Sequence, residues 1–282
     1  MKLSVKTRMV DKDYVETCLA KDGIVKLWLF DEEQLNDLLS FHDEQKPGYS
    51  SGFYATSFSS DFHYRKRVNE KIKQALGPQL KSVLPGYRIV FCNFLVKENR
   101  ADSQVPVHQD WTFVNENEEV SLNVWCPLVE TNALNGELQV FKGSHNLLEV
   151  IRAPFLPNPF MAEERLIRER YLTSCPTQLG EVLIYDHRLV HYSAPNMSKH
   201  PRQVANLSMV PVDSDLFYHY LDDSDGQQTL QKYQVTDEFF LTHRIGSRPK
   251  ECKELGTVQF PAGNFMGERD LRCLLESNMR YA

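Results

Sequence analysis

The spacing of hydrophobic positions changes along the chain, and the change marks the predicted core. From Tyr87 onward, short apolar segments alternate with polar residues at a period of two, and Gly, Asn and Pro turns separate them. Such alternation is typical of strands with one buried face, and a series of them predicts an antiparallel barrel or jelly roll. The predicted strands cover residues 87–97, 105–113, 119–128, 137–142, 181–186, 189–193 and 202–212.

The first 86 residues predict a strand and two helices beside this core. The strand is expected at residues 23–30. Asp31, with Gln34 three residues later, forms a capping box in front of an apolar stripe, so a helix should begin there. A second helix is expected from about Tyr64 to Leu76. It should end at Gly77, because glycine commonly follows a helix C-terminus.

Two more helices are expected outside the strands. The charged segment 161–172 predicts a helix that is either a solvated surface helix or a lid above a site. After about Leu221 the chain is polar and mixed, with a final helix near residues 268–276 that should pack on the outside of the barrel. No repeat or linker divides the chain. We therefore expect one domain, with an N-terminal support at about 1–86, a core at 87–212 and an extension at 213–282.

The composition of the chain limits the kinds of partner that the protein is expected to have. The formal net charge is −6 and the pI about 5.9, which disfavours nucleic acid or an anionic membrane as a partner. The chain starts without an apolar signal region, and no apolar run approaches the roughly 20 residues of a membrane span. Six cysteines without C-x-x-C spacing are expected as reduced thiols. We therefore expect a cytoplasmic protein with a small-molecule substrate and no obligate protein partner.

The motif His108-Gln109-Asp110 carries the candidate chemistry. Alternate residues of a strand point to one face, so His108 and Asp110 can reach the same ion. With His191 downstream, they make the set of two imidazoles and one carboxylate that holds non-haem Fe(II) and leaves positions open for oxygen chemistry. Arg202 heads a strand-like run, and Ser193 follows His191 by two residues. A guanidinium beside a hydroxyl is typical of a site for the far end of a dicarboxylate.

Five longer stretches extend these motifs. They are VHQDW at 107–111, SLNVWCPL at 121–128, NGELQVFKGSH at 135–145, LGEVLIY at 179–185 and HYSAPN at 191–196. In this order the chain resembles the phytanoyl-CoA dioxygenase family of Fe(II)/2-oxoglutarate-dependent oxygenases over about residues 88–212. The resemblance implies a double-stranded β-helix, that is, a cupin-like jelly roll with flanking α-helices. It also implies Fe(II), 2-oxoglutarate and O2, with a small organic molecule hydroxylated or otherwise oxidised while succinate and CO2 are released.

The same resemblance implies a role for each motif residue. His108, Asp110 and His191 would be the metal ligands and the catalytic centre. Arg202, with help from Ser193, would bind the far carboxylate of 2-oxoglutarate. Asp110 stands where halogenases of this type carry a small residue, so hydroxylation, or a related desaturation or ring closure, is favoured over halogenation.

Strand parity adds further candidates. Asn123 and Trp125 share the polar and aromatic face of the predicted strand 119–128, which fits the lumen of a barrel, and the resemblance implies that Trp125 lies near the cosubstrate. Asn93 and Lys97 share a parity on the strand 87–97, from which Lys97 could meet a carboxylate of cosubstrate or substrate. Trp111 and Tyr192 flank the metal ligands. They are candidates for the substrate pocket, although neighbours on a strand point away from each other.

Other functions stay open at this point. His187 and His191 are four residues apart, as in helical zinc proteases, but residue 188 is Arg and the segment is strand-like, so His187 is expected to be structural. His145, in a Gly-Ser-His turn, is expected to pin a loop. A cosubstrate-independent jelly-roll metalloenzyme and a non-catalytic metal- or ligand-binding barrel are the remaining alternatives.

The sequence gives little about the substrate. A CoA ester would need a basic patch for its phosphates, and the chain offers two modest clusters in an acidic background. This balance favours a small polar metabolite or a biosynthetic intermediate. The two clusters are Arg65, Lys66 and Arg67, and Arg165, Arg168 and Arg170.

Overall fold

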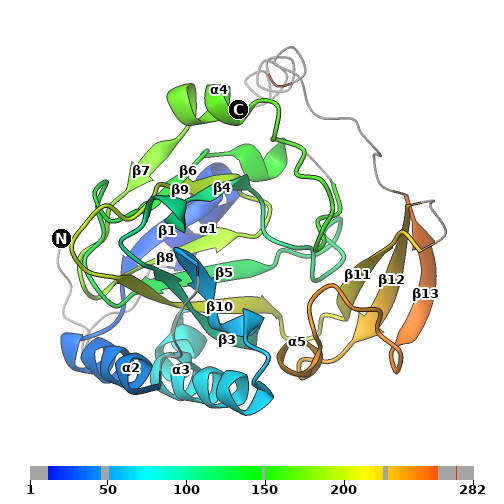
Figure 1. Ribbon diagram of the computed structural model, residues 1–282, viewed down its shortest axis with the longest axis horizontal. Coiled ribbons are helices and arrows are strands. Elements are labelled where there is room, and N and C mark those ends of the chain that lie inside the picture. The colour runs from blue at the N-terminus through cyan, green and yellow to red at the C-terminus, as the bar shows by residue number, and fades with distance from the viewer. Residues whose placement is uncertain (1–11, 46–50, 148–149, 225–227, 260–270, 272–282) are drawn as a thin grey trace.

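Two antiparallel sheets form the centre of the protein, as the computed structural model shows for residues 12–45, 51–147, 150–224, 228–259 and 271 (Figure 1). The larger sheet has the order β1 (Ile24–Trp28), β8 (Glu181–Asp186), β5 (Leu122–Pro127), β10 (Arg202–Pro211), β3 (Tyr87–Lys97) and β2 (Phe53–Ala55). The smaller sheet has the order β4 (Val105–His108), β9 (His191–Ser193), β6 (Leu138–Val140) and β7 (Thr173–Cys175). Side chains of both sheets pack together between them. The predicted mainly β jelly roll is confirmed.

Helices cover the other face of the larger sheet (Figure 1). They are α1 (Lys12–Asp22), α2 (Glu32–Gln45) and α3 (Phe62–Val83). The predicted capping box of α2 is confirmed, because Gln34 N donates to Asp31 Oδ1 at 2.9 Å. Leu35 and Leu38 of α2 are fully buried in the cluster that joins these helices to the sheet. Burial of this stripe is what holds the helix on the sheet.

The predicted end of the second helix is wrong. α3 does not stop at Gly77 but continues through Pro78 to Val83. Leu80 and Val83, beyond the glycine, are buried in the same cluster as Leu76, so the apolar stripe continues and favours the helix over the local stop signal. A Cβ at Gly77 would lie 3.4 Å from the Ile89 side chain. This is ordinary van der Waals contact, so the packing of α3 on β3 does not require a glycine at this position.

The predicted parity of β5 is confirmed. Leu122, Val124 and Cys126 are buried against the helices. Trp125 packs in the space between the two sheets, and Asn123 lies in a cavity there. Strand alternation therefore places a polar and aromatic surface inside the jelly roll.

The C-terminal extension contains a sheet that the sequence pattern did not predict. β11 (Leu216–Asp222), β12 (Thr229–Val235) and β13 (Lys253–Val258) form a separate three-stranded sheet, with α5 (Phe239–Thr242) between β12 and β13. An apolar cluster that includes Tyr218 and Tyr233 joins this sheet to Phe113 near the candidate ligands. The predicted helix near residues 268–276 lies outside the described residues, apart from Leu271.

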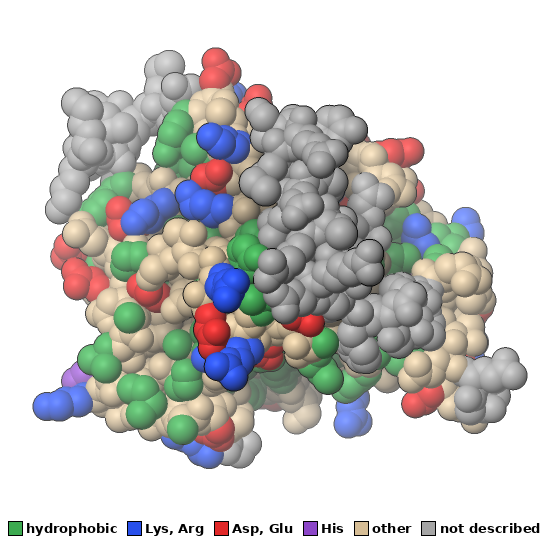
Figure 2. All heavy atoms as spheres, turned by 90° about the horizontal axis from the view of Figure 1, so that it is seen from above, with side chains coloured by type: hydrophobic (Ala, Val, Ile, Leu, Met, Phe, Trp, Pro, Cys, Tyr) green, Lys and Arg blue, Asp and Glu red, His purple; other side chains and the backbone are tan. Residues whose placement is uncertain are grey.

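α4 (Glu164–Arg170) is the short helix within the charged insertion. Its Ile167 is buried near β4, and Arg165 and Arg168 pair with Glu169 and Glu164 of the same helix. Figure 2, viewed from above Figure 1, shows blue and red side chains interspersed on the described part of this face. These ion pairs fit the predicted surface helix, and they neutralise Arg165 and Arg168 of the predicted basic cluster. In the part of the chain that the structure describes, 3₁₀ turns lie at Thr56–Phe58, Ala101–Ser103 and Ser144–Asn146. Within the described ranges, no helix has the length and apolar character that crossing a membrane requires.

Candidate active site

The two predicted imidazole ligands face each other across one strand pair. His108, the last residue of β4, lies directly opposite His191, the first residue of β9, and their ring centroids are 4.1 Å apart. His108 Nδ1 donates to Pro106 O and His191 Nδ1 to Leu189 O, both at 2.8 Å. Because a carbonyl oxygen only accepts, each ring carries its hydrogen on Nδ1 and presents the lone pair of Nε2.

Asp110 joins this pair by a route that the sequence did not predict. β4 ends at His108, so Asp110 lies in irregular chain after the strand, and the expected shared strand face is wrong. Main-chain hydrogen bonds fix it instead: Asp110 N donates to His187 O at 2.9 Å, and Asp110 O accepts from Arg152 Nε at 2.8 Å. Asp110 Oδ1 lies 3.9 Å from His108 Nε2 and 3.8 Å from His191 Nε2. The three side chains form a group that could hold a metal ion.

The protonation states suit metal binding. Desolvation by the surrounding protein, together with the neighbouring His191, lowers the pKa of His108 to about 4. Burial alone would raise the pKa of Asp110, but the three nearby histidines and the Asn123 hydrogen bond together hold it below its usual value. At neutral pH the cluster therefore presents a neutral His108 and an ionised carboxylate.

Asn123 lies in the cavity wall, as predicted, but its amide contacts the ligand carboxylate. Asn123 Nδ2 donates to Asp110 Oδ2 at 2.9 Å and to the Tyr185 hydroxyl at 3.0 Å. The Tyr185 ring in turn lies 5.1 Å from the His191 ring. Asn123 was expected to bind substrate; its contacts make it a positioning residue for Asp110. Tyr185 was not predicted. Its parity on the strand 181–186 was the only signal.

His187 has a structural contact and also faces the site. Its Nδ1 is 2.7 Å from Ser121 Oγ, which agrees with the structural role predicted for it. Its Nε2 is buried without a hydrogen-bond partner among the described residues, and its ring lines the cavity beside Asp110. The helical zinc motif does not form, because His187 lies in a turn after β8 and outside the His–Asp–His group. His145 does pin a loop, through Ala20 O at 3.2 Å.

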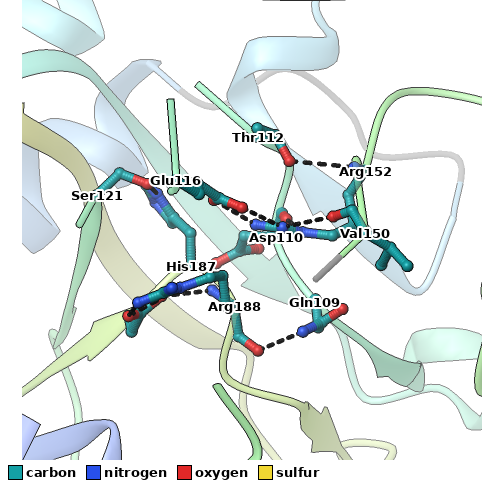
Figure 3. Close-up of polar contacts among 10 residues, drawn as sticks. Gln109, Asp110, Thr112, Glu116, Ser121, Val150, Arg152, His187 and Arg188 are labelled. Carbon is teal, nitrogen blue, oxygen red and sulfur yellow. Dashed lines mark hydrogen bonds and ion pairs between the residues drawn. The ribbon is translucent and has the colours of Figure 1, made fainter. Parts of the chain in front are cut away.

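Arg152 was not predicted either, and it ties the Asp110 backbone to two other segments (Figure 3). Besides its bond to Asp110 O, its guanidinium forms a two-pronged ion pair with Glu116 and donates to Val150 O. The side chains of Arg152 and Glu116 are largely buried. Thr112 and Arg152 also exchange hydrogen bonds, with Thr112 N donating to Arg152 O and Arg152 N to Thr112 Oγ1. Only long-range packing brings these segments together.

Arg202 lies at the inner end of the site. A cavity of about 240 Å³ between the two sheets is lined by the three candidate ligands and by Arg202, Trp125 and Asn123. Arg202 is 2% exposed, and its guanidinium lies 5.3 Å from the Trp125 ring centroid. Its Nε and one terminal nitrogen have no hydrogen-bond partner among the described residues. Burial lowers the pKa of Arg202 to about 9, so it stays protonated at neutral pH. A buried cation with unused donors needs an anion.

Two other residues that were predicted to contact the cosubstrate form hydrogen bonds with main-chain carbonyls. Ser193 lines the cavity, but its hydroxyl donates to Gly136 O at 2.8 Å. Lys97 points inward opposite Arg202, yet its Nζ donates to Ser193 O at 2.8 Å and Ala194 O at 2.6 Å. Burial, with the nearby Arg202 charge, lowers the pKa of Lys97 to about 6. In this arrangement Lys97 meets two carbonyls and not the expected carboxylate.

The remaining predicted residues divide between the site and the outer packing. Asn93 lines the inner cavity and accepts from Asn206 Nδ2 at 3.3 Å. Trp111 lines both this cavity and a larger outer cleft of about 930 Å³. Tyr192 packs its ring in an outer apolar cluster under Arg168. Tyr192 also lines the inner cavity, but its ring packs on the outer side, because it neighbours His191 and neighbours on a strand point to opposite faces.

The donor set and the buried cation fit the expected cofactors. Two imidazole nitrogens and one carboxylate suit non-haem Fe(II), and they leave coordination positions open. The unpartnered guanidinium of Arg202, in the same small cavity, suits the far carboxylate of 2-oxoglutarate. Fe(II) and 2-oxoglutarate thus fit the residues present.

Comparison with protein families decides the class. The family model described as phytanoyl-CoA dioxygenase (PhyH) matches residues 30–204. The chain belongs to the phytanoyl-CoA dioxygenase family. The matched residues make up more than half of the chain. A curated relative, the phytanoyl-CoA dioxygenase domain-containing protein 1 homolog of Dictyostelium discoideum, is 25% identical over 167 residues, which are 56% of this chain and 56% of the relative. The chain thus spans about half the length of that relative.

Solved structures share the fold. The epimerase SnoN of nogalamycin biosynthesis, in complex with Fe3+, alpha ketoglutarate and nogalamycin RO, matches with a TM-score of 0.59 and 15% identity over 90% of this chain and 97% of SnoN. The carbocyclase SnoK of the same biosynthesis matches with a TM-score of 0.57 and 17% identity over 72% of this chain and 85% of SnoK. At these identities the likeness establishes the jelly roll alone.

Proposed function

We propose that this protein is an Fe(II)/2-oxoglutarate-dependent hydroxylase of an organic molecule, with His108, Asp110 and His191 as the metal ligands and Arg202 as the cosubstrate clamp. The observation that carries the proposal is the pairing of the His–Asp–His group with an unpartnered, buried guanidinium in one cavity. When bound, Fe(II) and 2-oxoglutarate supply the oxidising chemistry that uses O2 and releases succinate and CO2.

The side chains of the protein would bind and orient the metal and the cosubstrate, and they would exclude water from the site. His108 and His191 present Nε2 because main-chain carbonyls hold their Nδ1 hydrogens. Asn123 and the Arg152 bond to the Asp110 carbonyl fix the direction of the carboxylate. Arg202 orients the cosubstrate through its far carboxylate, and Trp125 covers the guanidinium. Nothing in this arrangement requires a protein nucleophile.

Arg202 also supports this function over the alternatives. A cosubstrate-independent metalloenzyme would have no use for a buried cation with free donors, whose desolvation is costly. The same cost applies to a barrel that only binds a metal. Asp110 occupies the ligand position that a halide would need, which favours oxygen insertion over halogenation.

The test is an anaerobic titration of apoprotein with Fe(II) and then 2-oxoglutarate, followed by visible absorbance. We expect a weak charge-transfer band that needs both additions. Asp110→Ala should lose the band and the uncoupled release of succinate. Arg202→Gln should keep the band but require about tenfold or more 2-oxoglutarate, because one charge-assisted hydrogen bond is worth about 1.5–3 kcal/mol.

Arg248→Gln is the matched control, since Arg248 lies on the surface by the three-stranded sheet and pairs with Asp222 and Glu254. It should titrate like the wild type. Absence of the band in the wild type, with tight zinc binding in its place, would overturn the proposal. An unchanged 2-oxoglutarate requirement in Arg202→Gln would favour the cosubstrate-independent enzyme.

A further inference from the structure

The outer cleft opens directly onto the metal site. Its volume is about 930 Å³, nearly four times that of the inner cavity. Ser57, Phe58, His108, Gln109 and Trp111 line both spaces. A molecule in the cleft would therefore lie against the candidate ligand His108. If the proposed function holds, this cleft is where the substrate sits.

The walls of this cleft are mainly apolar, and two of its aromatic side chains face solvent. Phe58 is 56% exposed and Phe155 is 77% exposed. The segment 150–159 forms one wall and contributes Ile151, Leu156 and three prolines. Large apolar side chains exposed together around a concave surface indicate a ligand that covers them. Such a lining and volume suit a bulky apolar body, and they disfavour the small polar metabolite expected from the sequence.

Phe155 is held at the cleft by backbone geometry that most residues avoid. Its φ is +66°, and no other non-glycine residue in the described part of the chain has a positive φ. Its ring lies against Gly246, where φ is +81° and any Cβ would collide with the ring. A bulky residue in the left-handed region is strained, and such strain persists where the surroundings enforce it. This contact joins the 150–159 wall to the turn that carries Arg244.

The charges of the cleft are cationic, although the chain as a whole is acidic. Its lining includes Arg65, Arg152 and Arg244 and, among described residues, no Asp or Glu. Arg65 donates to the carbonyls of Thr242 and His243, and Arg152 is paired with Glu116. Arg244 is exposed, and no described residue pairs with its guanidinium. One cation is thus available to a ligand.

We propose that the outer cleft binds an organic monoanion with a bulky apolar body, whose anionic group pairs with Arg244 while its body packs against Phe155, Phe58 and Trp111. The identity of this ligand as the substrate rests on the proposed function. A CoA ester carries several phosphate charges, and a single available guanidinium does not match them. The cleft therefore selects a singly charged apolar acid.

The experiment measures binding by calorimetry under anaerobic conditions to protein loaded with Fe(II) and 2-oxoglutarate. Pyrenebutyrate and pyrenebutanol are the matched probes, since they share the apolar body and differ in charge. Dodecanoate tests a chain in place of rings, and dodecanoyl-CoA tests the polyanion. We expect pyrenebutyrate to bind about fivefold more tightly than pyrenebutanol, and either carboxylate to bind more tightly than the CoA ester.

The variants separate charge from apolar contact. Arg244→Gln should weaken the binding of pyrenebutyrate about fivefold and leave that of pyrenebutanol within about 1.5-fold. Phe155→Ala should weaken both probes by a similar factor of about five, because it removes apolar contact and no charge. Lys250→Gln, an exposed cation outside the cleft lining, is the control and should bind both probes like the wild type.

Three results would overturn the proposal: equal binding of the acid and the alcohol, equal loss of both in Arg244→Gln, or tighter binding of dodecanoyl-CoA than of dodecanoate. The charge-transfer band is recorded on the same samples. A missing band with normal probe binding would reject the proposed function and leave the cleft assignment intact. A normal band without probe binding would reject the cleft assignment alone.

Discussion

The Arg152 guanidinium donates to the main-chain carbonyl of Asp110 at 2.8 Å, so one residue connects the wall of the outer cleft to the candidate metal site. The same guanidinium is held by both carboxylate oxygens of Glu116. The position of Asp110 thus depends on the Arg152–Glu116 ion pair, which is not itself part of the His–Asp–His group. Its removal should disturb stability and metal binding separately.

Arg152→Met should reduce the free energy of unfolding by about 3 kcal/mol, because it leaves the Glu116 carboxylate largely buried without its partner. The double variant Arg152→Met/Glu116→Met should recover part of that loss. Fe(II) affinity should stay low in both, since the Asp110 carbonyl has lost its donor in each. Urea unfolding and metal titration of the wild type, the single variant and the double variant check this. Full recovery of metal affinity in the double variant would contradict the positioning role.

Asn123 should control the metal affinity through the Asp110 carboxylate. Asn123→Ala removes the 2.9 Å hydrogen bond to Asp110 Oδ2 and should weaken Fe(II) binding about 10- to 100-fold. Asn123→Asp keeps the shape but places a second carboxylate against Asp110. It should therefore raise the pKa of one of the two groups and make metal binding at pH 6 weaker than at pH 8. Metal titrations at both pH values test this, and pH-independent affinity in Asn123→Asp would argue against the contact.

Lys97 should make the free energy of unfolding depend on pH in the neutral and alkaline range. Burial lowers the pKa of Lys97 to about 6 in the folded protein, against roughly 10.4 in an unfolded chain. Between these values the unfolded state binds more protons, so the free energy of unfolding should rise with pH by up to about 1.4 kcal/mol per unit. Lys97→Met should lose this rise. Urea unfolding from pH 6.5 to 9 compares the two proteins, and parallel curves would show that Lys97 stays charged when folded.

His219 should contribute to acid sensitivity away from the metal ligands. Burial, with the charge of Lys232, lowers the pKa of His219 to about 4, against about 6.5 when unfolded. The unfolded state therefore binds more protons between these values, and stability should fall as pH drops from about 6.5 to 4. His219→Gln should flatten the curve in that window while leaving the anaerobic Fe(II)/2-oxoglutarate band in place. An unaltered slope in this variant would contradict the assignment.

Much of the candidate site follows from local patterns in the sequence. The period of two placed Asn123 and Trp125 inside the jelly roll, and the capping box placed the start of α2. The residue types alone, two His and one Asp, indicated a metal site, and the structure brings these three side chains into one group that could hold an ion. These predictions succeed because strand alternation and helix capping depend on neighbours within a few residues.

Only tertiary structure decided the contacts between distant segments. Asp110 reaches the histidines through bonds to His187 and Arg152, and Lys97 meets carbonyls of β9 and the residue after it. The spacing of residues in the sequence predicts neither the contacts of Asp110 nor those of Lys97, because both depend on how the two sheets and their loops pack. The strain at Phe155 likewise exists only against Gly246. The sequence thus determined the fold class and the kinds of chemical group in the site, while long-range packing decided which of them are paired and which remain free to bind a ligand.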